Sequence, residues 1–169
     1  SYSSSGIRRP RGGRIIMECY VKKLREDAII PHKAHATDTG YDLWVLDKHK
    51  ELDNGVVMYS TGLQIQPPWG LYFEIIPRSS IIKSGYIQAN SIGVVDSGYR
   101  GELFVPLYKI DKNSPDLELP KKIGQLVLRA IYTCEFIERD DLHKSHRGEG
   151  GFGSTDRMDE KARSMRVIS

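Results

Sequence analysis

Short runs of β-branched and aromatic residues fill the chain from about residue 17 to residue 138, and turn residues separate them. The runs read "YDLWVLD", "GVVMYSTGLQIQ", "GLYFEIIPR", "YIQA", "IGVVD", "GELFVPLYKI" and "GQLVLRAIYTCEF". Turn signals such as "PPWG" and "NSP" lie between them, and apolar residues alternate with a period of two from Leu103 to Tyr108. Only "REDAII" suggests a helical turn. Regularly spaced strands without helices predict an all-β fold: an antiparallel sandwich, a jelly roll or a barrel.

The two ends of the chain differ in composition from this core, residues 17–138. Residues 1–16 are rich in Ser, Gly and Arg and have no apolar period, which predicts a disordered basic leader. We expect the native chain to start at Met17, with the leader either added to it or a native extension. Residues 139–156 form a polar, Gly-rich arm, and residues 157–169 predict a disordered tail.

The charge distribution argues against a nucleic-acid binder. The net charge is +3, but the leader carries four arginines without an acid and the tail has a net charge of +2, so residues 17–156 carry −3. A mildly acidic core does not resemble a nucleic-acid binder, which would show a basic face, although contact of the basic ends with phosphate backbones stays open. Cys19 and Cys134 form no CxxC pair, which predicts neither a zinc site nor a disulfide framework. Without an apolar segment of signal-peptide or transmembrane type we expect an intracellular, cytoplasmic protein, with a nuclear address in the basic ends as the alternative.

Two polar segments at the ends of predicted strands have both a structural and a chemical interpretation. Asp42 in "DTGYDLWV" either caps a turn or faces a metal ion or its waters. Arg78, Ser79 and Ser80 follow a strand that ends at Pro77. A guanidinium beside two hydroxyls and free turn amides is a good receptor for phosphate oxygens, but an ordinary surface turn has the same composition.

The segment "ANSIGVVDSGYRGEL" is the richest in polar chemistry. Strand signals on both sides predict a β-hairpin with Asp96 and Tyr99 near its tip. The amide of Asn90 and the hairpin backbone can donate to and accept from a flat heterocycle. Asp96 can accept a proton from water, although an acid also favours a turn for structural reasons.

The arm contains "HRGEGGFGSTD", which joins a charge at Arg147, a flexible glycine backbone, the hydroxyls of Ser154 and Thr155, and one aromatic ring, Phe152. No lysine follows the glycines and no helix is predicted, so a P-loop is excluded. A loop that binds phosphate and a base, or a disordered glycine tail, remain as alternatives.

In this order, "GYDL", "PRSS", "GVVDSGYRGE", "GQLVL" and "RGEGGFGSTD" resemble the five motifs of homotrimeric deoxyuridine triphosphate nucleotidohydrolases (dUTPases), over roughly residues 20–156. The resemblance implies a jelly-roll subunit and a homotrimer whose active sites lie between subunits, each closed by a neighbour's C-terminal arm. It also implies Mg²⁺-dependent conversion of dUTP to dUMP and pyrophosphate, which keeps uracil out of DNA and supplies dUMP for dTMP synthesis.

By position in the motifs, the resemblance implies a role for each polar residue. Asp96 would activate the attacking water, and Tyr99 would exclude a 2′-hydroxyl. The uracil would be bound by Asn90, the main chain of Gly93 and Val94, and a stacked Phe152. Asp42 would hold waters of the Mg²⁺ ion. The residues implied to hold phosphate oxygens are Arg78, Ser79, Ser80, Gln125, Arg147, Gly153, Ser154 and Thr155.

Three motifs depart from the family pattern. The second is one residue shorter than usual before Lys83, the fourth keeps only Gln125 of Gly-Asp-Arg-x-x-Gln, and the fifth ends in Asp156 instead of Gly. Two other functions stay open: a dCTP deaminase or bifunctional relative on the same fold, and a non-catalytic trimer that senses dUTP or binds a partner protein. Independently of these, the tails could bind a partner. The "DSGY" segment argues against the deaminase, and the presence of Asp96 argues against the non-catalytic trimer.

Overall fold

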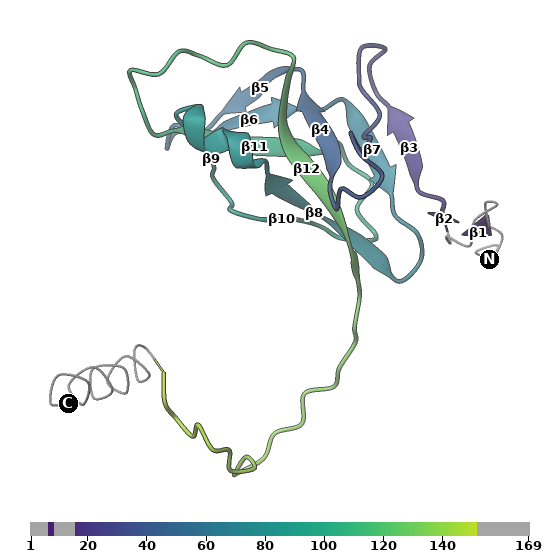
Figure 1. Ribbon diagram of the computed structural model, residues 1–169, viewed down its shortest axis with the longest axis vertical. Coiled ribbons are helices and arrows are strands. Elements are labelled where there is room, and N and C mark those ends of the chain that lie inside the picture. The colour runs from purple at the N-terminus through teal and green to yellow at the C-terminus, as the bar shows by residue number, and fades with distance from the viewer. Residues whose placement is uncertain (1–6, 9–15, 152–169) are drawn as a thin grey trace, which may run out of the picture. The chain divides into compact units, whose positions relative to one another are not determined.

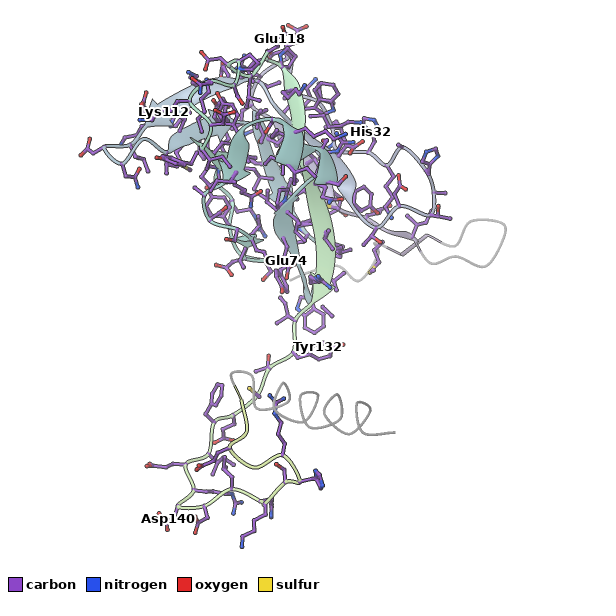
Figure 2. All side chains as sticks on the ribbon, turned by 60° about the vertical axis from the view of Figure 1, so that its left-hand side comes forward. His32, Glu74, Lys112, Glu118, Tyr132 and Asp140 are labelled. Atoms are coloured by element: carbon purple, nitrogen blue, oxygen red, sulfur yellow. The ribbon has the colours of Figure 1, made fainter. Side chains whose placement is uncertain are left out.

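The computed structural model describes residues 7–8 and 16–151. The chain divides into two compact units, a core unit that ends at Tyr132, labelled in Figure 2, and an arm unit that begins at Thr133. Within the described residues no helix is long and apolar enough to cross a membrane.

The core unit is built of antiparallel strands, as the alternating sequence pattern predicts (Figure 1). One four-stranded sheet, the inner-site sheet, has the order β10-β8-β12-β4, and a second, the edge-site sheet, has the order β5-β6-β11-β9. β3 pairs with β7, and β1 pairs with β2. The bounds are β1 (Ile7–Arg8), β2 (Ile16–Met17), β3 (Tyr20–Lys23), β4 (Tyr41–Val45), β5 (Asp47–Glu51), β6 (Val57–Ser60), β7 (Leu63–Gln66), β8 (Leu71–Pro77), β9 (Tyr86–Gln88), β10 (Gly93–Val95), β11 (Phe104–Lys109) and β12 (Lys121–Ala130).

A single hydrophobic core joins the two four-stranded sheets. Leu43 and Leu126 come from the inner-site sheet, and Tyr59 and Leu107 from the edge-site sheet, and all four are at most 1% exposed. Successive side chains of a strand point to opposite faces, so the alternate residues of β4 and β12 are left to form polar surface. The prediction of an all-β, jelly-roll type of subunit is confirmed, and the helix among the described residues is a short 3-10 turn, η1 (Ser79–Lys83).

The structure differs from the predicted strands at two places. β5 was not predicted, because its sequence "DKHKE" is charged and largely exposed along an edge of the sheet, where β6 is its one partner among the described strands. β12 ends at Ala130, although the predicted strand continues to Phe136, which is 95% exposed. "REDAII", which suggests a helical turn, forms a single turn in which the Ala28 N–H donates to the Arg25 carbonyl at 3.2 Å. In the leader, Ile7–Arg8 pairs with Ile16–Met17.

The predicted hairpin around Asp96 is wrong. β10 pairs with β8 in the inner-site sheet, whereas β11 pairs with β6 and β9 in the edge-site sheet. The segment from Asp96 to Leu103 is therefore a connection between two sheets and not the tip of a hairpin. Strand propensity marks both runs correctly but does not specify which partner each run pairs with.

Candidate functional site

A first cleft, the Asp96 cleft, lies where β10 ends and the chain crosses to β11. Its volume is about 220 Å³. It contains five of the residues predicted to act on a nucleoside or on water. The lining is Met58, Ile75, Asn90, Gly93, Val94, Val95, Asp96, Tyr99, Glu102, Leu103 and Phe104.

A tight turn presents Asp96 at the rim of this cleft. The Tyr99 N–H donates to the Asp96 carbonyl at 3.0 Å, and the Arg100 guanidinium donates to the carbonyl of Ser97 at 2.7 Å. These bonds fix the backbone without using the Asp96 carboxylate, which is exposed and has no hydrogen bond or ion pair to another described residue. The carboxylate is thus held on an ordered turn and is free to accept a proton from water.

Glu102, which the sequence reasoning did not single out, fixes the far end of this connection. Its carboxylate accepts hydrogen bonds from the Gly62 N–H at 2.8 Å and from the Ser60 hydroxyl. Its backbone carbonyl accepts the hydroxyl of Tyr99 at 2.8 Å. Glu102 therefore holds both the Tyr99 ring and the β6–β7 turn by hydrogen bonds. Ser60 and Gly62, at that turn, are about 40 positions away from Glu102 in the sequence.

Asn90 and Gly93 form the base of the same cleft. A Cβ atom added to Gly93 would lie 3.1 Å from the Asn90 Nδ2 and 3.3 Å from the Ile75 Cβ, so a side chain there would press the Asn90 amide away from the strand. Val94, the next residue along β10, is 61% exposed and lines the cleft on an edge strand, whose outer backbone groups are not paired within the sheet. The cleft thus combines a side-chain amide with accessible backbone groups, which suits the edge of a planar base.

A second cleft, the Asp42 cleft, lies beside the strand pair β4–β12 and has a volume of about 260 Å³. Gln125 is directly opposite Asp42 in the antiparallel register. Its amide donates to the Pro77 carbonyl at 3.3 Å. The lining is Ala34, Asp38, Thr39, Gly40, Asp42, Arg78, Ser79 and Gln125.

Asp42 is the electrostatic centre of this cleft. Its carboxylate lies 3.3 Å from the Arg78 Nε and 2.9 Å from the Lys122 Nζ, and its side chain is only 13% exposed. Two cations flank this largely buried carboxylate, and the guanidinium of Arg78 itself lines the cleft, where it can bind anionic oxygens. No group of three or more His, Cys, Asp or Glu side chains suited to a metal ion occurs among the described residues.

Lys122 is a second residue that the sequence reasoning missed. In the pattern Gly-Asp-Arg-x-x-Gln, counting back from Gln125 places Lys122 at the position of the arginine. The β12–β4 register shifts between Lys122 and Gly124, so this strand keeps an irregularity beside the cleft. Lys122 thus forms an ion pair with Asp42 from the position at which the family pattern has an arginine.

The remaining predicted site residues lie elsewhere. Ser80 is exposed in η1 and lines neither of the two clefts. In the arm unit, the Arg147 guanidinium donates to the Gly150 carbonyl at 2.6 Å. Phe152, Gly153, Ser154 and Thr155 lie outside the described residues, so their predicted roles stay predictions.

Comparison with known proteins decides the family. The model of the dUTPase family matches residues 26–156, which is most of the chain. This chain belongs to the dUTPase family. A deoxyuridine 5′-triphosphate nucleotidohydrolase of Clostridioides difficile is 38% identical over 136 residues, which covers 80% of this chain and 95% of the relative. One of Solanum lycopersicum is 37% identical over 135 residues and covers 80% of this chain and 79% of the relative.

Solved dUTPase structures share the fold. The dUTPase of Staphylococcus bacteriophage 80alpha with dUPNHPP matches with a TM-score of 0.64 and 23% identity, over 81% of this chain and 97% of the phage protein. A mutant dUTPase of phage phi11 of S. aureus, described as revealing the coordination of a structural Mg(II) ion, matches with a TM-score of 0.60 and 21% identity, over 75% of this chain and 99% of that protein. The resemblance inferred from the five motifs is therefore confirmed at the level of family and fold.

Proposed function

We propose that this dUTPase-family chain hydrolyses dUTP to dUMP and pyrophosphate. The observation that supports the proposal is that the polar residues predicted to bind a nucleotide lie in two separate clefts. The Asp96 cleft has the amide and backbone groups that suit a nucleoside, and the Asp42 cleft has the cationic and hydroxyl groups that suit a triphosphate. A nucleotide needs both sets, and the curated relatives are named for this reaction.

In the Asp96 cleft, the base and sugar are selected by shape and hydrogen bonding. The Asn90 amide, with the main chain at Gly93 and Val94, reads the edge of uracil, so that the amino group at C4 of cytosine is mispaired. The Tyr99 ring, fixed by its hydroxyl on the Glu102 carbonyl, packs on the deoxyribose and leaves no space for a 2′-hydroxyl. Both selections place the α-phosphate near the exposed carboxylate of Asp96.

Asp96 acts as the general base. It accepts a proton from a water molecule whose oxygen attacks the α-phosphorus, the bond from that phosphorus to the bridging oxygen breaks, and pyrophosphate leaves with the electron pair. In such a displacement the protein mainly positions the reactants and neutralises charge. Arg78, Ser79 and Gln125 hold the phosphate oxygens, and the arm of a neighbouring subunit, through Arg147 and residues 152–155, closes over the phosphates and the base.

The donor set of the Asp42 cleft fits a Mg²⁺ ion that arrives with the triphosphate and keeps its waters. Mg²⁺ commonly uses one or two carboxylates together with substrate phosphates and several waters. Asp42 offers one carboxylate, already flanked by Arg78 and Lys122, and no larger cluster of acidic ligands accompanies it among the described residues. When bound, the ion would neutralise phosphate charge, while Asp42 would hold its waters.

We further propose that the enzyme is a homotrimer. The Asp96 cleft and the Asp42 cleft share no lining residue, so each supplies only part of what a nucleotide needs. Association of identical subunits with closed symmetry can bring one subunit's Asp96 cleft to another's Asp42 cleft. A molecular mass of one chain in light scattering, from an active preparation, would contradict this assembly.

Product analysis tests the function. The protein is incubated with Mg²⁺ and, separately, dUTP, dCTP, dTTP and UTP, and the nucleotides are separated by chromatography. We expect dUMP from dUTP alone. Deamination of dCTP would transfer the proposal to the deaminase reaction, and binding of dUTP without turnover would show a non-catalytic trimer.

An Asp96→Asn variant tests the general base. We expect kcat to fall by about 10²–10⁴-fold with dUTP binding retained, because the amide cannot accept the proton. Asp53→Asn, a change at an exposed turn acid outside both clefts, is the matched control. Wild-type turnover by Asp96→Asn would remove Asp96 from this role.

A further inference from the structure

Gln88 is a buried polar residue that the reaction outlined above does not use. It belongs to β9 in the edge-site sheet, where it pairs with Leu107, and only 6% of it is exposed. Its side-chain amide crosses to the other sheet and donates to the carbonyl of Ile75 on β8 at 2.9 Å. The same nitrogen donates to the carbonyl of Ser91 at 3.4 Å.

The orientation of this amide is determined by its neighbours. Both neighbouring atoms are carbonyl oxygens, which only accept hydrogen bonds, so the nitrogen must face them. The Gln88 Oε1 is consequently buried without a hydrogen-bond partner among the described residues. A buried, unpaired acceptor is unfavourable, and an apolar residue would avoid it, so the amide is explained by the two bonds that its nitrogen makes.

Those bonds hold an unusual backbone conformation. Ser91 has a φ of +57°, in the left-handed region that residues other than glycine rarely occupy. The Ser91 N–H donates to the Gln88 carbonyl at 3.1 Å, and the Ser91 carbonyl accepts from the Gln88 side chain. Gln88 thus binds Ser91 through both of its backbone polar groups.

This turn carries the base of the Asp96 cleft. Asn90 precedes Ser91 and Gly93 follows two residues later, and the Ile92 N–H donates to the Asn90 carbonyl at 2.6 Å. Ile75, whose carbonyl Gln88 binds, is opposite Gly93 in the β8–β10 register. Gln88 therefore contacts both the turn that carries Asn90 and the strand against which Asn90 lies.

We propose that Gln88 is a positioning residue for base recognition, which holds the left-handed Ser91 turn against β8 and so sets where the Asn90 amide lies in the Asp96 cleft. This inference rests on the proposed function, because it assigns Asn90 to the base. Asp96 lies beyond β10 on a separate turn with its own hydrogen bonds, so loss of Gln88 affects binding and selection of the base more than the chemical step.

The first test is Gln88→Met, which keeps the approximate volume and removes both donated bonds. The control is Gln64→Met, since Gln64 is a half-buried strand residue that makes no side-chain hydrogen bond to another described residue and lines neither cleft. We expect the KM for dUTP to rise about 10-fold, kcat to change less than about 3-fold, and the preference in kcat/KM for dUTP over dCTP to fall about 10-fold. Simple destabilisation would lower both substrates' rates equally, so an unchanged preference overturns the inference.

Two changes at the exposed Ser91 separate positioning from packing. Ser91→Val disfavours the left-handed conformation without touching the core, and we expect it to lose base preference as Gln88→Met does, even if the core variant folds poorly. Glycine adopts the left-handed conformation without steric penalty, so Ser91→Gly should recover part of the preference in a Gln88→Met background. A double variant no better than Gln88→Met would overturn the role of this turn.

Two measurements without turnover distinguish failure of the inference from failure of the proposed function. Hydrogen exchange of the Ser91 amide should be about 10-fold faster in Gln88→Met than in Gln64→Met, because its bonded turn opens more often. Calorimetry with dUMP and dCMP should show the same loss of base preference as the kinetics. If the wild-type protein fails to hydrolyse dUTP, the proposed function is wrong. In that case the inference is overturned as well if the wild-type protein and Gln88→Met show the same ratio of affinities for dUMP and dCMP.

Discussion

Gly101→Ala is expected to displace the Tyr99 ring and weaken the exclusion of ribonucleotides. A Cβ atom built on Gly101 would lie 2.5 Å from the Tyr99 Cζ and 3.0 Å from its Cε2, and closer still to the hydroxyl oxygen. No packed structure tolerates such contacts, so the ring must move. Tyr99 is 44% exposed, so it can swing toward solvent without disturbing the core.

The main loss of stability is the hydrogen bond from the Tyr99 hydroxyl to the Glu102 carbonyl, which contributes about 1 kcal/mol. The melting temperature should therefore fall by only about 3–5 °C. Loss of the ring from the sugar side should raise the ratio of kcat/KM for UTP to that for dUTP about 10-fold or more.

Steady-state kinetics with both nucleotides measures this ratio, and Gly98→Ala is the matched control. Gly98 lies in the same connection, but nothing is within 4 Å of a Cβ built there. A UTP-to-dUTP ratio in Gly101→Ala equal to that of Gly98→Ala would refute the assignment of Tyr99 as the sugar-selecting residue. A large loss of stability would show instead that the ring is fixed more firmly than its exposure indicates.

Three further predictions concern the Asp42 cleft, the arm and acid stability. Lys122→Met should lower the free energy of unfolding by about 1–2 kcal/mol in urea titrations and raise the KM for dUTP. The KM should rise because the largely buried Asp42 then draws Arg78 away from phosphate. Lys122→Arg should retain the wild-type stability and KM. Truncation after residue 145 should lower kcat/KM by about 100-fold. The melting temperature should change by less than about 2 °C, since the last strand ends at Ala130. A large loss of stability would show instead that the arm stabilises the fold. The ammonium of Lys109 holds the pKa of Asp116 below its ordinary value of 3.8, so this carboxylate adds stability above that pH and loses it as the pH falls through its lowered pKa. The melting temperature of Asp116→Asn should accordingly lie below that of the wild type at pH 7 and converge with it in acid; an equal difference at pH 7 and pH 2.5 would contradict the assignment.

Much of the candidate site could be read from the chain because its motifs are local. Asn90, Gly93, Val94, Asp96 and Tyr99 lie within ten residues, and the structure places all five at one cleft. The contacts that hold them are not local. Ser60 and Gly62 reach the Glu102 carboxylate across about 40 residues, and no spacing rule indicates such a bond.

The same limit applies to Lys122. Its partner Asp42 is 80 residues away, and a lysine near the start of a strand is ordinarily a solvated side chain. The family pattern marked the position as atypical, but only the β12–β4 register brings the two side chains to the same face. The charge-rich β5 was missed for a related reason, since an edge strand is defined by its pairing and not by apolar alternation.

By itself, the sequence determined the all-β class, through the alternation of residues such as Leu103, Val105 and Leu107, and the family, through five motifs in a characteristic order. Both are properties of neighbouring residues, because side chains alternate along a strand whatever its partner. The tertiary structure alone decided that β10 and β11 belong to different sheets, that two separate clefts divide the polar residues, and that Gln88 reaches across to Ile75. These features depend on which distant strands pair, and that choice follows from burial of the whole core rather than from the propensity of any one segment.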